Sequence, residues 1–526
     1  MGRVLVIAWD GADWQILDPL LQVGALPNLS RLIERGGRAV LKSTLPPHSW
    51  SAWPSFLTGV EPADHGVFDI VEPRREGRQS FPVSYRSVRE RTFLADLSRA
   101  GVETVMVNVP LTFPPPQISG KLIAGGVLPK RRPFTYPEGL ADELEAAGAG
   151  FPINGMSWTT FRHRPEPFLE EVREFVTRRQ RTMEHLLDTT DWRVACLVFV
   201  ATDRVQHCLS NYISPDHPDY ERLSKQPLAE KVRDVYRLLD EGLGRLVDRT
   251  GPEDLVMFIS DHGSQACTGA VNMDRLLEQA GFLEFSRSKA VLGPLQWGPM
   301  RSLARRVYDV LGLHGKVRIP TAVNWAATKA YTSVHSTGEG ISVNLAGREP
   351  EGIVDPGDYE RVRDEVAERV AAFTDPRTRR RPVARIWRRE EVFKGKHAED
   401  APDLLLEAAP LYSLTHARSA VEPADWLSGD HRVDGVFAAA GPAVDRAAFP
   451  DAAALVDLAP TILAAVGVAP SVRHAGSALR PVVGRDLTAA TTGGPDDRTT
   501  STESAGIAEA EVEEVEEHLR GLGYLE

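Results

Sequence analysis

Short runs of apolar residues recur along this chain, and three of them lead directly into polar residues. The runs cover residues 4–9, 194–200 and 255–260, and their apolar character is continuous rather than alternating. Continuous runs of this length are typical of strands that are buried on both faces, which is the pattern of a parallel sheet. The chain therefore predicts several core strands of one sheet.

Helical patterns separate these runs. Residues 92–100, 166–187 and 231–247 are predicted helices, and the last two have an apolar face. This alternation predicts an α/β fold, with a doubly wound, mostly parallel sheet and helices on both of its faces. Ligands of such sheets lie outside the carboxyl ends of the strands. The polar residues that follow the runs are therefore expected to meet at one edge.

Seven residues of the kinds that ligate metal ions lie at the ends of these runs or in turns after them. They are Asp10, Ser49, Asp203, His207, Asp261, His262 and His431. Asp203 and His207 are four positions apart, so one helical turn would bring them to the same face. Asp261 and His262 are adjacent and can face one ion only where the strand breaks, which Gly263 permits. Carboxylates and histidines that converge in this way are typical of two-metal hydrolases.

Residues 1–486 are predicted to form one catalytic domain with insertions. Its core is expected at about 1–126, 191–284 and 426–486, its inserted subdomains at about 127–190 and 285–425, a flexible linker at 487–506 and a C-terminal helical tail at 507–526. The low complexity of the linker residues is the reason for expecting flexibility there. Apolar runs at 403–406 and 435–440 indicate where the core resumes.

The composition of the chain argues against some classes of binding partner and indicates the cellular compartment that we expect. The formal net charge of −12 argues against nonspecific binding to nucleic acid or to an anionic membrane. An anionic substrate stays possible, because bound metal ions can invert the local field. The sequence has no secretory signal pattern and no run of the roughly 18 apolar residues that a membrane span needs. The three cysteines have no metal or redox spacing, so we expect a cytoplasmic protein.

Several motifs in one order make a more specific pattern than any of them alone. They are Trp-Asp-Gly at 9–11, Pro-Pro-His-Ser-Trp-Ser-Ala-Trp-Pro-Ser-Phe-Leu-Thr-Gly at 46–59, Asp-x-x-x-His at 203–207, Asp-His-Gly at 261–263 and Gly-Asp-His at 429–431. Together they resemble the type I phosphodiesterase/nucleotide pyrophosphatase family of the alkaline phosphatase superfamily. The resemblance runs from residue 4 to about residue 486, and it implies an alkaline-phosphatase-like fold.

The resemblance also implies roles for the candidate site residues. Ser49 takes the position of the nucleophile and, with Asp10, Asp261 and His262, would hold one divalent metal ion. Asp203, His207 and His431 would hold a second ion. The family usually binds zinc, which this ligand set suits, although manganese or another divalent ion is possible. Trp50 opens a predicted helix whose N-terminus faces the phosphoryl group, and it is a candidate for contact with the substrate.

The implied reaction is hydrolysis of a phosphodiester or pyrophosphate bond through a phosphoseryl intermediate, with a small-molecule phosphate ester as the substrate. A phosphomonoesterase, or a transferase of phosphoryl or phospho-alcohol groups, is an alternative on the same metal core, because the insertions select the substrate. A catalytically silent scaffold is a third possibility, against which the intact Ser49 and metal-ligand positions argue. A sulfatase is disfavoured, since Trp53 stands where that class needs arginine. The subunit number stays open.

Several polar residues near the motifs are expected to support the site rather than to form it. Asp13, Asp64 and Asp430 are most simply turn residues or partners of the ligands. His48 and His65 lie near the serine in sequence but outside the matched ligand set. We expect His65 to pack or to form local hydrogen bonds.

Overall fold

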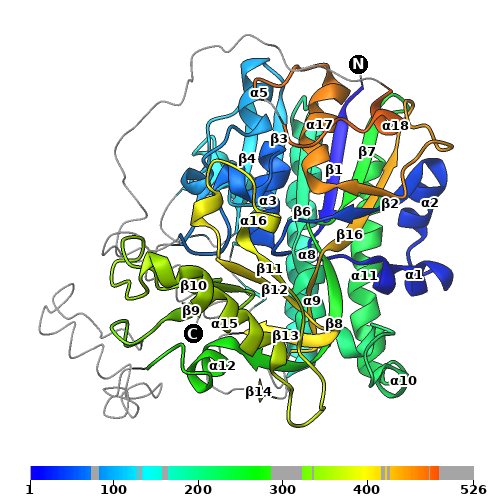
Figure 1. The fold of residues 1–526 in the computed structure, drawn as a ribbon. Coiled ribbons are helices and arrows are strands. Elements are labelled where there is room, and N and C mark those ends of the chain that lie inside the picture. Colours follow the sequence, from blue (N-terminus) through cyan, green and yellow to red (C-terminus); the bar gives the residue numbers. More distant parts are fainter. Residues whose placement is uncertain are drawn as a thin grey trace, which may run out of the picture.

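A nine-stranded sheet lies at the centre of the computed structural model (Figure 1). In spatial order its strands are β17 (Ala452–Ala454), β2 (Gly37–Lys42), β16 (Asp434–Ala440), β7 (Leu255–Ile259), β1 (Val4–Trp9), β6 (Val194–Phe199), β3 (Thr104–Pro110), β4 (Gly120–Gly125) and β5 (Thr135–Tyr136). The structure describes residues 2–72, 82–126, 128, 133–153, 155–156, 161, 164–285, 323–334, 337–415, 421–422, 427–472 and 474–484.

Five neighbouring strands of this sheet, from β7 to β4, run parallel. β16 is antiparallel to both of its neighbours, and β5 is antiparallel to β4 at the other edge. β1 lies between β6 and β7, so the chain winds outward from β1 in both directions. Such a switch point opens a crevice at the carboxyl ends of the strands.

Alternate side chains of β1 enter two separate hydrophobic cores. Leu5, Ile7 and Trp9 belong to one core, whereas the even-numbered residues Val4, Val6 and Ala8 belong to the other. Successive side chains of a strand point to opposite faces, so a strand with no exposed face needs apolar residues at every position. The continuous apolar run thus has the burial that it predicted.

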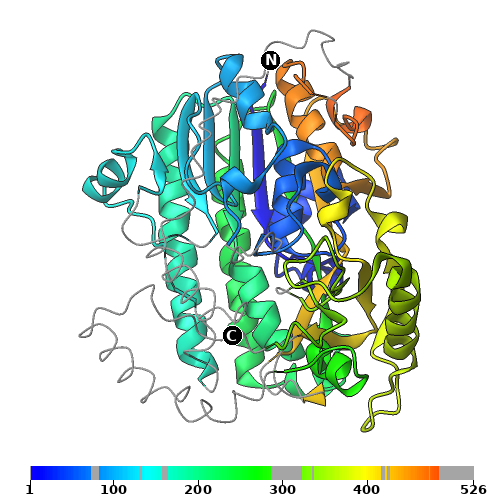
Figure 2. The same cartoon turned by 60° about the vertical axis from the view of Figure 1, so that its left-hand side comes forward.

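Helices cover both faces of the sheet (Figure 2). On the face of the first core lie α1 (Trp14–Gln22), α2 (Pro27–Arg35), α6 (Leu140–Ala146), α8 (Pro165–Thr189), α9 (Ala201–Leu209) and α11 (Pro227–Val247). On the other face lie α3 (Ser49–Thr58), α5 (Phe93–Arg99), α17 (Leu458–Val466) and α18 (Arg480–Val483). The predicted doubly wound, mostly parallel α/β architecture is therefore confirmed.

A second lobe packs at the carboxyl edge of the sheet (Figure 1). It contains one sheet with the order β11 (Val383–Arg388), β12 (Leu404–Ala408), β10 (Gly340–Val343) and β9 (Ala330–Thr332). In another sheet β8 (Gly263–Asn272) pairs with β13 (Leu411–Thr415), β14 (Val421–Glu422) and β15 (Gly429–Arg432). α12 (Met273–Gln279) and α15 (Tyr359–Ala372) share one hydrophobic cluster with strands of both sheets.

Two segments differ from the expected boundaries. Residues 403–406, where the core was expected to resume, lead into β12 (Leu404–Ala408) of the second lobe rather than into the central sheet, whereas the run at 435–440 lies in β16. The range 127–190 contributes β5 to the central sheet and α8 to its helical layer, so these elements are continuous with the core. The linker at 487–506 and the tail at 507–526 lie outside the described residues.

The length and apolar character of the helices decide whether any of them could cross a membrane. Within the described part of the chain, none of them combines the length with the apolar character that crossing a membrane requires.

Candidate active site

The site begins where the three central strands end. β1 pairs in register with β6 and with β7, so their carboxyl ends lie side by side. Asp10 follows β1 directly, Asp261 lies just beyond β7, and Asp203 lies in the first turn of α9, which follows β6. The structure thus brings together carboxylates from three distant parts of the sequence, as the strand pattern predicted.

Ser49 enters this edge from the start of α3. His48 is the residue that precedes the helix, and its Nδ1 accepts a hydrogen bond from the Ser51 N–H at 3.2 Å. The Ser49 hydroxyl oxygen lies 3.3 Å from Asp10 Oδ1 and 3.2 Å from His262 Nε2. The serine therefore lies at a helix N-terminus, in contact with two of the predicted ligands.

Asp10, Asp261 and His262 form one compact group. Their ligand atoms all lie within 4.8 Å of one another. His262 Nε2 is 3.6 Å from Asp10 Oδ1 and 3.4 Å from Asp261 Oδ2. The Gly11 N–H donates to Asp261 Oδ1, and the Trp53 indole N–H donates to Asp10 Oδ2. Each carboxylate is thus oriented by one hydrogen bond and keeps an oxygen toward His262.

Asp203, His207 and His431 form a second, adjoining group. His207 Nε2 lies 3.1 Å from Asp203 Oδ1, so the spacing of four along α9 has the predicted effect. His431, on β15, has its Nε2 3.4 Å from the same oxygen and 3.0 Å from His207 Nε2. The rings of His262 and His431 are 4.1 Å apart between centroids, so the two groups are contiguous.

Gly11 and Gly263 allow the backbone to come this close. Gly11 has a φ of +66°, in the left-handed region that favours glycine, where its N–H reaches Asp261. Gly263 has no positive φ, but a Cβ there would lie 2.0 Å from the Asp434 carbonyl oxygen. The glycine after His262 is therefore required by close packing, rather than by the turn that we expected.

The donor set fits a divalent cation. Nδ1 of His207 donates to the Gly429 carbonyl and Nδ1 of His262 to the Gly263 carbonyl, each at 3.0 Å. With the proton at Nδ1, the Nε2 lone pair of each ring is free for a metal ion. In the described part of the chain, the buried Asp261 Oδ2 has no hydrogen-bond partner. An ion held by Asp10, Asp261 and His262 would meet that oxygen and the lone pair of His262.

The pKa shifts of the carboxylates also agree with a site that fits a divalent cation. Burial and the neighbouring carboxylates Asp261 and Asp203 raise the pKa of Asp10 well above its usual value, and burial also raises the pKa of Asp261. Burial alone would raise the pKa of Asp203, but His207 and His431 outweigh it and hold that pKa well below its usual value. Crowded carboxylates are costly unless a cation neutralises them, and a divalent ion does so.

The supporting residues behave largely as expected. Asp13 caps α1 by accepting from the Gln15 N–H at 2.8 Å, and it forms an ion pair with Arg432 at 2.7 Å. His65 Nε2 lies 3.0 Å from the Ser55 hydroxyl, and its Nδ1 accepts from the Val67 N–H at 3.2 Å.

Asp430 could bind a cation in addition to the turn role that we expected for it. One of its carboxylate oxygens lies within 4.8 Å of ligand atoms of both His207 and His431, so it could also hold a cation. Its position between Gly429 and His431 in a family motif was the only sequence signal for this.

The structure gives Trp50 a packing environment. Its side chain is 7% exposed and packs in a small cluster with Val67, Ile70 and Leu111. The contact of Trp50 with substrate that we expected stays a prediction.

Comparisons with known proteins agree with this architecture. Among solved structures, phosphonoacetate hydrolase from Sinorhizobium meliloti 1021 in complex with phosphonoacetate is similar, with a TM-score of 0.55 and 15% identity over 87% of this chain and 94% of that chain. Murine ectonucleotide pyrophosphatase/phosphodiesterase 5 gives a TM-score of 0.52 and 15% identity over 90% of this chain and 97% of that chain. An inactive variant of the murine protein in complex with AMP gives 0.52 and 14%, over 91% and 98%.

These identities establish a shared fold. No curated protein sequence matches the chain significantly. The model of the type I phosphodiesterase / nucleotide pyrophosphatase family matches residues 4–434, which is most of the chain and includes every predicted ligand position. The chain therefore belongs to the type I phosphodiesterase / nucleotide pyrophosphatase family and is a hydrolase of the phosphodiesterase type.

Proposed function

We propose that this enzyme hydrolyses a phosphodiester or pyrophosphate bond through a phosphoseryl intermediate on Ser49. The observation that carries the proposal is the position of the Ser49 hydroxyl, 3.3 Å from Asp10 and 3.2 Å from His262 at the N-terminus of α3. A hydroxyl among potential metal ligands can be activated as a nucleophile, and a helix N-terminus favours an anionic phosphoryl group.

Two divalent cations, most simply zinc, complete this proposal. Asp10, Ser49, Asp261 and His262 would hold one ion, and Asp203, His207 and His431 would hold the other. When bound, the ions supply Lewis acidity that lowers the pKa of the serine hydroxyl and offsets charge on the phosphoryl oxygens. A set of imidazole and carboxylate ligands suits zinc.

The chain's own residues then define the reaction. The Ser49 oxygen forms a bond to phosphorus while the bond from phosphorus to the leaving oxygen breaks. Water next takes the place of Ser49 on phosphorus, which releases the second product and restores the hydroxyl. Both displacements are in line, so configuration at phosphorus is retained overall. The Gly429 and Gly263 carbonyls keep the protons of His207 and His262 at Nδ1 throughout.

Hydrolysis of bis-4-nitrophenyl phosphate against 4-nitrophenyl phosphate tests the reaction. We expect metal-loaded wild-type protein to prefer the diester, and Ser49→Ala to lose turnover by about a thousandfold or more while keeping fold and metal. A Ser49→Ala variant with full activity would contradict the serine nucleophile. A preference for the monoester would favour the phosphatase or transferase alternative on the same site.

The substrate and the compartment are further parts of this proposal. We expect a small-molecule phosphate ester, because the structurally similar proteins were solved with phosphonoacetate and with AMP, both small phosphorus compounds. We also propose a cytoplasmic location, on the sequence patterns alone.

A further inference from the structure

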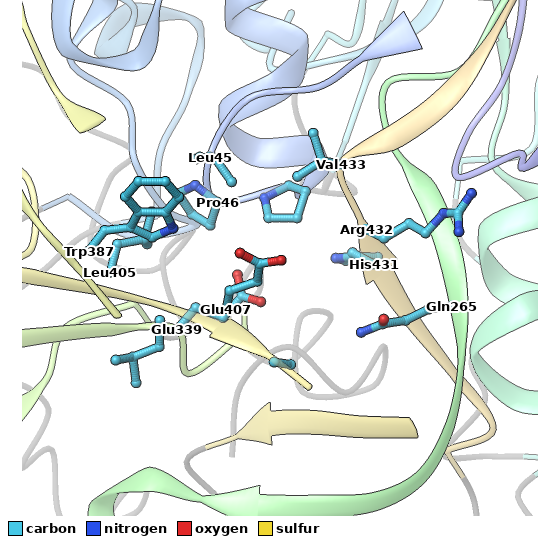
Figure 3. Close-up of a pocket in the computed structure, with 13 residues that line it drawn as sticks. Leu45, Pro46, Gln265, Glu339, Trp387, Leu405, Glu407, His431, Arg432 and Val433 are labelled. Atoms are coloured by element: carbon cyan, nitrogen blue, oxygen red, sulfur yellow. The ribbon is translucent and has the colours of Figure 1, made fainter. Parts of the chain in front are cut away.

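A cavity of about 60 Å³ lies beside the candidate metal ligands (Figure 3). Pro46 from the loop before Ser49, His431 and Arg432 from β15, and Glu339, Trp387 and Glu407 from the second lobe contribute to its walls. His431 belongs both to the cavity wall and to the candidate metal ligands, because its Nε2 faces His207 and Asp203. The cavity is therefore next to the place where the phosphoryl group of a substrate would lie.

Two carboxylates point into this cavity below Pro46 (Figure 3). Glu339 is 9% exposed, and its only hydrogen bond through the carboxylate in the described part of the chain is from the Thr337 hydroxyl at 3.3 Å. Glu407 is exposed at the mouth of the cavity. Burial and the nearby Asp430 and Glu407 raise the pKa of Glu339 well above its usual value. A buried carboxyl group of this kind is costly without a partner.

Two arginines near the cavity, among the residues that the structure describes, have other contacts. The Arg432 guanidinium points away from the cavity in Figure 3 and pairs with Asp13 at 2.7 Å. Arg385 stands opposite Glu407 in the pairing of β11 with β12, but its guanidinium stacks on Trp387, 3.2 Å from the ring centroid. Within the described residues, neither Glu339 nor Glu407 forms an ion pair. Among the described residues, the cavity therefore has two carboxyl groups that lack an ion-pair partner, although the Arg385 guanidinium lies on the Trp387 wall.

Two further polar atoms at the walls also have unused hydrogen-bonding capacity. The Trp387 Nε1 and the His431 Nδ1 are buried without a hydrogen-bond partner among the described residues, and the His431 side chain is only 7% exposed. Buried polar groups are normally satisfied by protein, water or a ligand. The indole N–H can donate to an ester oxygen, while the carboxyl groups accept from a donor.

We propose that this cavity binds a small primary ammonium group carried by an alcohol moiety of the phosphate ester. The proposal rests on the proposed function, because it assigns the part of the substrate beyond the phosphorus. An ammonium ion offers three donors and a positive charge to the paired carboxyl groups. The same walls repel additional phosphate groups, so an amino-alcohol diester is preferred over a nucleoside polyphosphate.

Two diesters of the same shape test whether the cavity recognises a positive charge on the substrate. 2-Aminoethyl 4-nitrophenyl phosphate and n-propyl 4-nitrophenyl phosphate differ only in an ammonium or a methyl group at the end of the chain. With metal-loaded full-length protein we expect kcat/KM for the aminoethyl ester to be higher by about tenfold or more. Glu339→Gln and Glu407→Gln should each remove most of this preference, measured as the ratio of the two kcat/KM values within one variant.

Glu351→Gln is the matched control, because Glu351 is an exposed carboxylate of the same lobe outside the cavity. It should keep the preference unchanged. Equal rates for the two esters with wild-type protein, or a preference that survives both cavity variants, would overturn the proposal. A higher rate for the 2-hydroxyethyl ester than for the aminoethyl ester would also overturn it, and would indicate a site for a hydroxyl group.

Measurements of ligand binding can distinguish a failure of the ammonium site from a failure of the proposed reaction. Calorimetric titration with 2-aminoethyl phosphate and n-propyl phosphate should give tighter binding of the amine to wild-type protein, and no such difference with Glu407→Gln. If neither diester is cleaved but the difference in binding persists, the proposed reaction fails and the ammonium site stands. If the esters are cleaved and no difference in binding exists, the ammonium site fails alone.

Discussion

The three histidines of the site are held in different ways, and this difference has consequences for metal binding. His207 and His262 each donate through Nδ1 to a backbone carbonyl, whereas the buried His431 Nδ1 has no such partner among the described residues. The orientation of the His431 ring therefore depends on its contacts with Asp203, His207 and His262 rather than on a backbone carbonyl. His431 nevertheless joins the second group of ligands and the ammonium cavity, so its loss should affect both.

We predict that His431→Ala retains about one divalent ion per chain where the wild type retains about two, because one group loses a ligand and the other stays complete. Metal content after gel filtration, measured by atomic emission, checks this. His185→Ala, on α8 outside the site, is the control and should keep the wild-type content. A His431→Ala variant with undiminished content would show that His431 is not a ligand.

At the scale of elements, the buried His65 joins α4 (Pro62–His65) to α3 through the Ser55 hydroxyl. Burial lowers the pKa of His65 to about 3, against about 6.5 in an unfolded chain. The unfolded state therefore binds the proton more readily. The stability that His65 contributes is complete above about pH 6.5 and is lost as the pH falls toward 3.

We predict that the melting temperature of the wild type falls between pH 7 and pH 5, and that His65→Asn falls by less over this range. The expected slope for one such group is about 1.4 kcal/mol per pH unit below its unfolded pKa. Asparagine can still accept from the Val67 N–H, so the comparison isolates the titration. Parallel melting curves for the two proteins across this range would refute the assignment. His48, whose pKa burial lowers to about 4, contributes in the same direction in both proteins.

The elements also show how far the sequence could predict the structure. The runs at 4–9, 194–200 and 255–260 correspond to β1, β6 and β7, because a strand buried on both faces has a distinct composition. Leu404, Leu405 and Leu406 are also apolar and buried but lie in another sheet, since apolar character does not say which strand will be the partner. The ligands could be predicted from motif order, whereas the ammonium cavity unites Glu339, Trp387 and Glu407 only through the packing of the second lobe.

For the whole molecule, the proposed metal site would connect the central sheet with the second lobe, since Asp10 and Asp261 follow core strands and His431 lies on β15, which pairs with β8. We predict that a chelator lowers the melting temperature of the entire protein by several degrees, and that added zinc restores it, because an ion that binds only the folded state stabilises that state. Differential scanning calorimetry checks this. Ser49→Ala should show the same response as the wild type, and an unchanged melting temperature after chelation would contradict an ion that connects these parts.

Because the chain winds outward from β1, the candidate site residues come from segments that are synthesised at very different times. Ser49 meets His262, 213 positions later, and His207 meets His431, 224 positions later. Contacts this distant in sequence form slowly and only after both segments exist. A nascent chain that has passed Ser49 carries the proposed nucleophile but not His207, His262 or His431. If the proposed function holds, hydrolysis of phosphate esters would begin only after β15, with its His431, has been synthesised.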